Sequence, residues 1–304
     1  MLVRLIPMVF VVLWASGFVG ARIGLQYAEP ATLLTLRMMA NLGVFTLLVV
    51  MMRSSVPQGK MFWHSCVVGI LIHGLYLGGT YIAIGLGMPS GLSAILVGTQ
   101  PILTAIIFVT CAREQLRLSQ WLGLALGFIG ISLVLVGKTQ WQDDSHKFIA
   151  IGLCIVSLFG ITFGTLYQKY FCSGVDKVGS ALVHYFAASC LFLPYAMTFE
   201  TMSVNWTVEF TLTLIWLVVV LSGFAIMLFL FMVEHGASEK VASIFYLVPP
   251  MTAVQAWLIF GESFDNTAII GFILSAIAVY LITRIKEPVT KRITKGSNII
   301  SKFS

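Results

Sequence analysis

Polar side chains at helical spacing interrupt several long apolar stretches of this sequence. His73, Tyr76 and Thr80 follow one another at intervals of three and four, which places them on one face of a helix. Gln100 stands directly before Pro101, which bends a helix and frees a carbonyl of the preceding turn. Polar groups in hydrocarbon are costly unless paired or hydrated, so we expect these faces to line an interior cavity.

The candidate binding residues come from four apolar stretches and have structural alternatives. Serine and threonine often bond to their own helix, a histidine is often a satisfied core group, and aromatic side chains often only pack. The candidate substrate-binding residues are Trp14, Ser16, His73, Tyr76, Thr80, Gln100 and Tyr246, and the candidate hinge residues are Pro101, Pro249 and Pro250.

The sequence offers little for catalysis. The residues Asp143, Asp144 and His146 form a hydrophilic stretch, and paired acids or a metal-binding histidine set are not visible. There is no phosphate-binding loop of the GxxxxGK[ST] type, and the five cysteines are scattered without a metal-like spacing. We therefore predict no enzyme, no cofactor and no metal site.

Composition identifies the elements that must position the polar residues. The chain is 59% hydrophobic and only 10% charged, with a mean hydropathy of +0.97, whereas a soluble protein has about 25% charged residues. A span needs about 20 apolar residues. We predict an all-α membrane protein of ten transmembrane helices, near residues 5–25, 31–52, 63–84, 90–111, 118–137, 148–168, 178–198, 211–232, 240–260 and 267–284. The first range is too long for the apolar region of a signal peptide and is kept as a helix.

The positive charges orient these helices. Fourteen of the eighteen lysines and arginines fall on one side, including the basic tail at 285–304, and three fall on the other. Cytoplasmic loops are rich in lysine and arginine, so both termini are expected in the cytoplasm. Topology accounts for the net charge of +6, and no nucleic-acid partner is predicted. Arg37 lies within a span, where we expect a structural role through snorkelling or pairing near the periplasmic side.

The chain also repeats itself. Residues 93–101 align with 242–250, and residues 123–130 align with 271–278, with small residues at matching positions. The predicted domains are therefore one five-helix repeat at 5–137 and a second at 148–284. Because five is odd, the copies are inverted in the membrane, which is a geometry of alternating access with the substrate between the halves.

These features resemble the drug/metabolite transporter superfamily, in its EamA-type branch. The resemblance rests on the motif at 13–18, on Pro30 followed by Leu36 and Arg37, on Gln100-Pro101, and on Pro249-Pro250 followed by Gly261-Glu262. The second half carries His184 where the first carries Arg37, and the glutamate of Arg113-Glu114 stands one place later than in the second half. The resemblance implies a central cavity lined by helices one, three, four, six, eight and nine.

The predicted function is export of amino acids or related small metabolites by a secondary transporter of the bacterial inner membrane; the substrate class follows from the resemblance. Uptake of a small cationic or nucleoside-like solute is one alternative, and an intramembrane transferase or a scaffold protein belongs to another class. The expected partners are a small molecule and the lipid bilayer, with the chain a monomer or weak dimer. Proton coupling stays open, since no acidic residue is predicted at mid-membrane.

Overall fold

The regular elements of the chain are helices. The computed structural model describes residues 6–112, 118–136, 144–225, 228 and 247–283. The α-helices in these ranges are α1 (Ile6–Gly24), α2 (Pro30–Met52), α3 (Lys60–Gly69), α4 (Gly78–Gly85), α5 (Ser90–Gly98), α6 (Gln100–Ala112), α7 (Leu118–Val136), α8 (Lys147–Phe171), α9 (Lys177–Phe199), α10 (Val208–Ile215), α13 (Val248–Phe260) and α14 (Asn266–Thr283). A short 3₁₀ turn, Asp144–His146, precedes α8.

Within the described residues, six helical stretches are long and apolar enough to cross a bilayer. They are Ile6–Gly24, Pro30–Met52, Lys60–Gly85, Lys147–Phe171, Lys177–Phe199 and Val208–Ala225, and shorter apolar helices occur at Trp121–Gly130, Val248–Phe260 and Asn266–Ala278. Each of the six begins within three residues of a predicted span. Large apolar side chains such as Phe128 and Phe148 are mostly exposed, as expected where lipid is the solvent. The chain is an all-helical, multi-pass membrane protein over its described residues.

Two of these spans change from α- to π-helix partway along. The segment Ile70–Leu77 joins α3 to α4, and the segment Trp216–Ala225 continues α10. Such segments are rare and occur frequently at functional sites. They lie in the predicted third and eighth helices, which are equivalent positions of the predicted repeat. The π-helical geometry alters the helical spacing that was used to place His73 and Tyr76 on one face with Thr80.

The span predicted at 90–111 is broken at Thr99. Pro101 has no backbone N–H to give to the carbonyl of Val97, so the α-helical bonding pattern fails there. The Thr99 hydroxyl donates instead to the carbonyl of Leu96 at 2.6 Å. The break separates α5 from α6.

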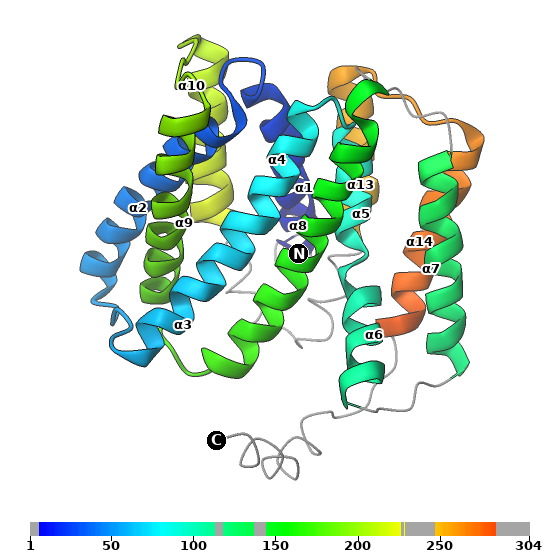
Figure 1. Cartoon of the computed structure of the whole chain (residues 1–304), viewed down its shortest axis with the longest axis horizontal. Coiled ribbons are helices and arrows are strands. Elements are labelled where there is room, and N and C mark those ends of the chain that lie inside the picture. Colours follow the sequence, from blue (N-terminus) through cyan, green and yellow to red (C-terminus); the bar gives the residue numbers. More distant parts are fainter. Residues whose placement is uncertain (1–5, 113–117, 137–143, 226–227, 229–246, 284–304) are drawn as a thin grey trace.

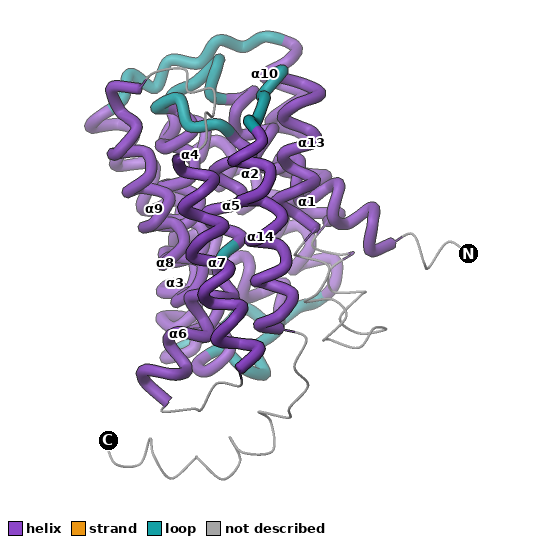
Figure 2. Tube along the Cα trace, turned by 90° about the vertical axis from the view of Figure 1, so that its right-hand side faces the viewer, coloured by secondary structure: helices purple, strands orange, loops and turns teal. Residues whose placement is uncertain are grey.

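Two pairs of helices lie at opposite sides of the bundle, and other helices lie between them. Figure 1 shows α2 beside α9 on one side, α7 beside α14 on the other, and α1, α4, α5 and α8 in between. The side view in Figure 2 also places α7 against α14. A Cβ added to Gly130 of α7 would lie 2.5 Å from Ser275 Oγ and 2.8 Å from the Gly271 carbonyl oxygen, so these backbones touch. Small residues allow two helix backbones in a membrane to approach this closely.

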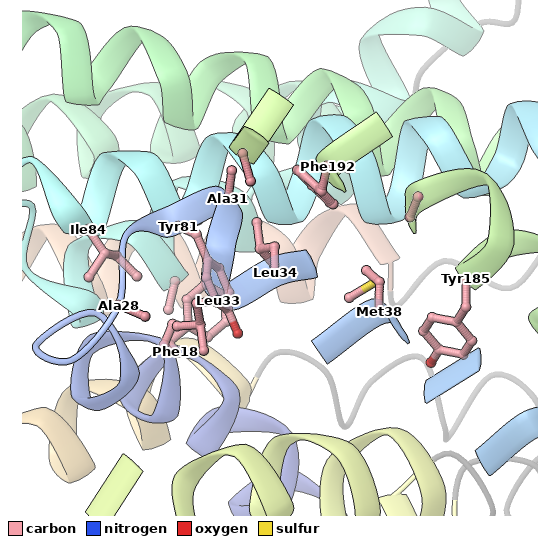
Figure 3. Close-up of a cluster of buried hydrophobic side chains, with 14 of the residues drawn as sticks. Phe18, Ala28, Ala31, Leu33, Leu34, Met38, Tyr81, Ile84, Tyr185 and Phe192 are labelled. Atoms are coloured by element: carbon pink, nitrogen blue, oxygen red, sulfur yellow. The ribbon is translucent and has the colours of Figure 1, made fainter. Parts of the chain in front are cut away.

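The largest buried cluster lies between α1, α2, α4 and α9. It includes Leu34 and Met38 of α2, Tyr81 of α4, and Tyr185 of α9, which Figure 3 shows along α2 and its neighbours. Two tyrosines within this apolar cluster place hydroxyl groups in the interior of the bundle. A buried hydroxyl needs a partner, and the partner of Tyr81 leads to the candidate site.

Candidate functional site

Arg37 is buried inside the bundle. Helix α2 begins at Pro30, whose missing N–H is harmless in a first turn. Arg37 lies seven residues further on, about 10 Å along the helix at about 1.5 Å per residue. The residue is 6% exposed, and its Nη1 donates a hydrogen bond of 2.6 Å to the Tyr81 hydroxyl. Arg37 therefore does not snorkel to water, contrary to one of the two roles expected from the sequence.

The side chains around Arg37 come from both halves of the chain. The His73 ring lies 4.7 Å from the Tyr185 ring and 6.1 Å from the His184 ring, measured between centroids. The guanidinium is within electrostatic range of His73, Tyr76 and Tyr185. His184 Nε2 shares a hydrogen bond of 3.1 Å with Ser180 Oγ. We call this set the Arg37 cluster: Arg37, Asn41, His73, Tyr76, Tyr81, His184, Tyr185 and Ser222.

Several polar atoms of the cluster have no hydrogen-bond partner. Asn41, one turn after Arg37, is fully buried; its Nδ2 donates to Ser222 Oγ at 3.2 Å. The unpartnered atoms include Asn41 Oδ1, Arg37 Nε and His73 Nδ1. Buried polar groups are nearly always bonded to protein, water or ligand. The Arg37 cluster therefore contains buried donors and acceptors that can form further hydrogen bonds.

Arg37 also lacks an ion pair within the described part of the chain. The carboxylates whose side chains are described all lie at or beside helix ends: Glu29, Asp176, Glu200, Glu209, Glu262 and Asp265. A buried guanidinium without a counter-charge is costly, because desolvation is not offset by attraction. Contact with an anion would offset part of the desolvation cost of the Arg37 guanidinium.

Glu262 forms a contrasting and saturated network, which we call the Glu262 network. Gly261 ends α13 in the left-handed region, at φ 67°, and turns the chain so that Glu262 is buried. Glu262 forms an ion pair with Arg22 of α1. Its Oε1 also accepts from the Ser90 amide at 2.9 Å and the Ser90 hydroxyl at 3.0 Å, and Oε2 accepts from the Gly91 amide at 3.3 Å. One carboxylate therefore joins α1 and α13 to the N-terminus of α5.

Two further carboxylates, Glu29 and Glu200, join the start of α2 to the end of α9. Glu200 accepts from the amides of Ala31 and Thr32 at 2.8 and 2.7 Å, and so caps α2. Glu29 reciprocates by accepting from the Thr201 amide at 2.7 Å and from its hydroxyl at 2.6 Å. These caps fix the start of the helix that carries Arg37.

Among the residues predicted from the sequence, those of the third span meet the Arg37 cluster. His73 and Tyr76 belong to it, while the buried Thr80 hydroxyl, next to Tyr81, has no hydrogen-bond partner. The satisfied-core alternative for His73 does not apply to its Nδ1, which also lacks a partner.

The predicted residues of the first helix lie elsewhere. Ser16 Oγ donates to the Leu13 carbonyl, as the self-bonding alternative has it, and accepts from Trp216 Nε1 at 2.8 Å. Trp14 is half-buried, with its ring centroid 5.3 Å from that of Phe10. These contacts join α1 to the π-helical segment of the eighth predicted span.

Gln100 and the prolines lie where α5 and α6 contact α8, α13 and α14. Gln100 Nε2 donates to Thr165 Oγ1 of α8 at 2.9 Å. Pro101 lies in the first turn of α6, and Pro249 and Pro250 lie in the first turn of α13. A Cβ on Gly98 would be 2.6 Å from Pro249 Cγ, and a small pocket between these segments extends to α14. Tyr246 lies outside the described residues.

Sequence reasoning missed half of the cluster: Asn41, Tyr81, Tyr185 and Ser222. The resemblance directs attention to helices one, three, four, six, eight and nine, whereas Arg37 and Asn41 are on the second helix and Tyr185 is on the seventh. The signal was present in the spacing of Arg37 and Asn41, four residues apart on one face of an apolar helix.

The membrane-spanning helices and the family comparison together identify the chain as a multi-pass membrane transporter. The EamA-like transporter family matches residues 3–136 and again 148–284. The chain belongs to the EamA-like transporter family. Transport rather than catalysis is the activity of that family.

Proteins of similar sequence carry transporter names. The uncharacterized transporter YvbV of Bacillus subtilis is 24% identical over 274 residues, covering 90% of this chain and 88% of YvbV. The uncharacterized inner membrane transporter YedA of Escherichia coli is 21% identical, covering 90% of this chain and 87% of YedA. A probable amino-acid metabolite efflux pump of Escherichia coli is 23% identical, covering 91% of this chain and 93% of the pump.

A solved crystal structure of a protein shares the fold. It superposes with a TM-score of 0.63 at 16% identity, and the match covers 92% of this chain and 96% of the other.

Proposed function

We propose that this chain is a secondary transporter of the bacterial inner membrane that exports amino acids or related small metabolites by alternating access. The observation that carries the proposal is the composition of the Arg37 cluster. Arg37 and His73 come from the first predicted repeat, and His184 and Tyr185 come from the second. A polar cluster shared by two halves and left with unpartnered atoms is the kind of site that alternating access uses.

Three observations support ten helices in two inverted repeats, at 5–137 and 148–284. The family matches the chain twice. The two π-helical segments fall in the third and eighth predicted spans. The contact of Arg22 with Glu262, and that of Glu200 with Thr32, join chain positions that a ten-span alternation puts on one face of the membrane. The charge distribution of the sequence makes that face periplasmic and both termini cytoplasmic.

The substrate class is supported by the site and by the names of relatives. Two relatives, from Salmonella typhimurium and Escherichia coli, are named as probable amino-acid metabolite efflux pumps, and another as an inner membrane transporter. The alternative of a small cation has less support, because the buried positive charge of Arg37 would repel it. In this proposal Trp14, Ser16, Gln100 and Tyr246 line the path, Pro101, Pro249 and Pro250 serve as hinges, and the chain acts as a monomer or weak dimer.

A thermal-shift screen followed by counterflow tests this function. Purified protein is heated with amino acids, nucleosides, quaternary amines or polyamines, since binding to the folded state raises the unfolding temperature. Compounds that stabilise are then tested for counterflow into proteoliposomes, with protein-free liposomes as the control. We expect amino acids to stabilise and to exchange. Stabilisation by quaternary amines or nucleosides alone would favour the uptake alternative, and no counterflow of any compound would contradict transport.

A further inference from the structure

The strongest unexplained feature of the molecule is the state of the Arg37 guanidinium. This group stays charged in proteins, the residue is 6% exposed, and within the described residues the guanidinium donates its hydrogen bond to a neutral phenol, that of Tyr81. Within the described residues it has no ion pair, and its Nε–H is buried without an acceptor. The guanidinium therefore has donor capacity that its described neighbours leave unused.

The surroundings of this group favour a small anion over other fillers. A guanidinium offers parallel N–H donors that match the two oxygens of a carboxylate. His73 lies within electrostatic range of Arg37 and holds an unpartnered Nδ1, which is a further donor in one tautomer. Tyr185, whose ring is 4.7 Å from the His73 ring, comes from the second half of the chain, and its hydroxyl interacts with Ser222.

Beside these donors the Arg37 cluster also holds a free acceptor, Oδ1 of Asn41. Asn41 lies one helical turn from Arg37, and its Oδ1 is unpartnered while its Nδ2 is held by Ser222. Because Nδ2 is engaged, Oδ1 is directed away from Ser222 and is available to a donor. A ligand with an acidic group and a neighbouring N–H or O–H would satisfy Arg37 and Asn41 together.

We propose that Arg37 binds the carboxylate of the transported molecule, and that Asn41 accepts a hydrogen bond from the substituent beside that carboxylate. The inference rests on the proposed transport function and narrows its substrates to small α-substituted carboxylic acids, amino acids among them. Arg37 and Asn41 are substrate-binding residues in this assignment, and Tyr81 positions the guanidinium.

Matched probe pairs test the assignment. The probes are L-leucine, L-phenylalanine, L-methionine and L-threonine, each beside its carboxamide, which keeps the shape and removes the negative charge. Each is measured as a competitor of amino-acid counterflow in proteoliposomes and as a stabiliser in thermal unfolding. Hydrogen bonds to charged groups are strong enough that the acid should compete at a concentration at least about tenfold below that of its amide.

Variants show whether Arg37 causes the preference. Arg37→Met should bring the ratio of acid to amide competition to about one. Arg37→Lys keeps the charge without the paired donors and should retain part of the preference. Arg53→Met is the matched control, because Arg53 is an exposed arginine at the other end of the same helix, and it should leave the ratio unchanged.

The outcomes separate the two proposals. Equal competition by acids and amides in the wild-type protein, with counterflow intact, would overturn carboxylate binding and leave transport standing. An unchanged ratio in Arg37→Met would overturn the role of Arg37. If Arg37→Met is lost during purification, the wild-type ratio and Arg37→Lys decide. No binding or counterflow of any probe would overturn both proposals.

Discussion

Two arginines of this chain, one partly buried and one buried, have opposite surroundings. Arg22, with 16% of its side chain exposed, faces a carboxylate that also accepts hydrogen bonds from Ser90 and Gly91. Arg37 is buried more deeply, faces a phenol, and keeps an unpartnered Nε. The first arginine is part of a saturated network at a helix end. The second is part of an unsaturated cluster inside the bundle.

The difference teaches what each region contributes. A charge that is fully paired stabilises the arrangement of the helices that it joins, and removing one partner leaves the other exposed to its full desolvation cost. A buried charge that lacks a counter-charge does not stabilise the protein, which fits the ligand-binding role proposed for Arg37. Stability and function should therefore respond in opposite order to substitutions in the two regions.

The largest loss of stability is expected for Glu262→Ala. The change leaves Arg22 without its counter-ion and removes the acceptor at the N-terminus of α5. Breaking a buried pair in this way costs about 3–5 kcal/mol. Thermal unfolding in detergent measures it, with Glu209→Ala, an exposed carboxylate of α10, as the control. An unfolding temperature equal to that of the control would remove the Glu262 network as a stabilising element.

A smaller loss is expected for Glu200→Ala. This carboxylate caps α2 through the amides of Ala31 and Thr32, and the loss of a cap costs about 0.5–2 kcal/mol. The same unfolding assay should rank it between Glu262→Ala and the Glu209→Ala control. A loss exceeding that of Glu262→Ala would show that the α2–α9 contact, rather than the Glu262 network, dominates stability.

Gln100→Ala should affect transport more than stability. The substitution removes one half-buried hydrogen bond to Thr165, worth about 0.5–1.5 kcal/mol. If Gln100 lines the path, counterflow should nevertheless fall at least about tenfold, because a hydrogen bond worth about 1.4 kcal/mol corresponds to a factor of about ten. Wild-type counterflow with normal membrane expression would exclude Gln100 from the path.

The smallest change in stability is expected for Arg37→Met. The substitution removes a costly buried charge but also the partner of the Tyr81 hydroxyl; these effects oppose each other, so the free energy of unfolding should shift by less than about 1 kcal/mol. Arg22→Met is the direct comparison and should be clearly destabilised, because it leaves the Glu262 carboxylate unpaired. If the two methionine variants lost equal stability, the proposed contrast between the regions would be wrong.

The sequence predicted the spans well because their apolar length is a local property. The starts of α2 and α9 fall within one residue of the predictions, whereas the contact of α7 with α14 at Gly130 was not predicted. Ten helices and an inverted repeat stay a proposal. Much of the site could not be foreseen, since its partners are distant in sequence: Arg37 and Tyr81 are 44 residues apart, and Asn41 and Ser222 are 181 apart.

The apolar character of a span also hides which face points inward. In Ile70–Leu77 only His73 and Tyr76 mark a polar face, and the π-helical geometry changes the spacing on which their placement depends. Arg37 was noticed but assigned to a structural role, because its surroundings on α4 and α9 are a property of the packing. The candidates of the third span lie at or beside the Arg37 cluster, and all of the candidate binding residues and hinge prolines remain predictions.

The reciprocal caps at Glu29 and Glu200 have a mechanical consequence. Four hydrogen bonds from the amides of Ala31, Thr32 and Thr201 and the hydroxyl of Thr201 tie the start of α2 to the end of α9, and the Asn205 amide adds a bond to the Tyr27 carbonyl. Separating these ends would break all of these bonds at once. In the proposed alternating access we therefore expect α2 and α9 to move together, carrying Arg37 and Tyr185, so that an opening on this face runs along another boundary.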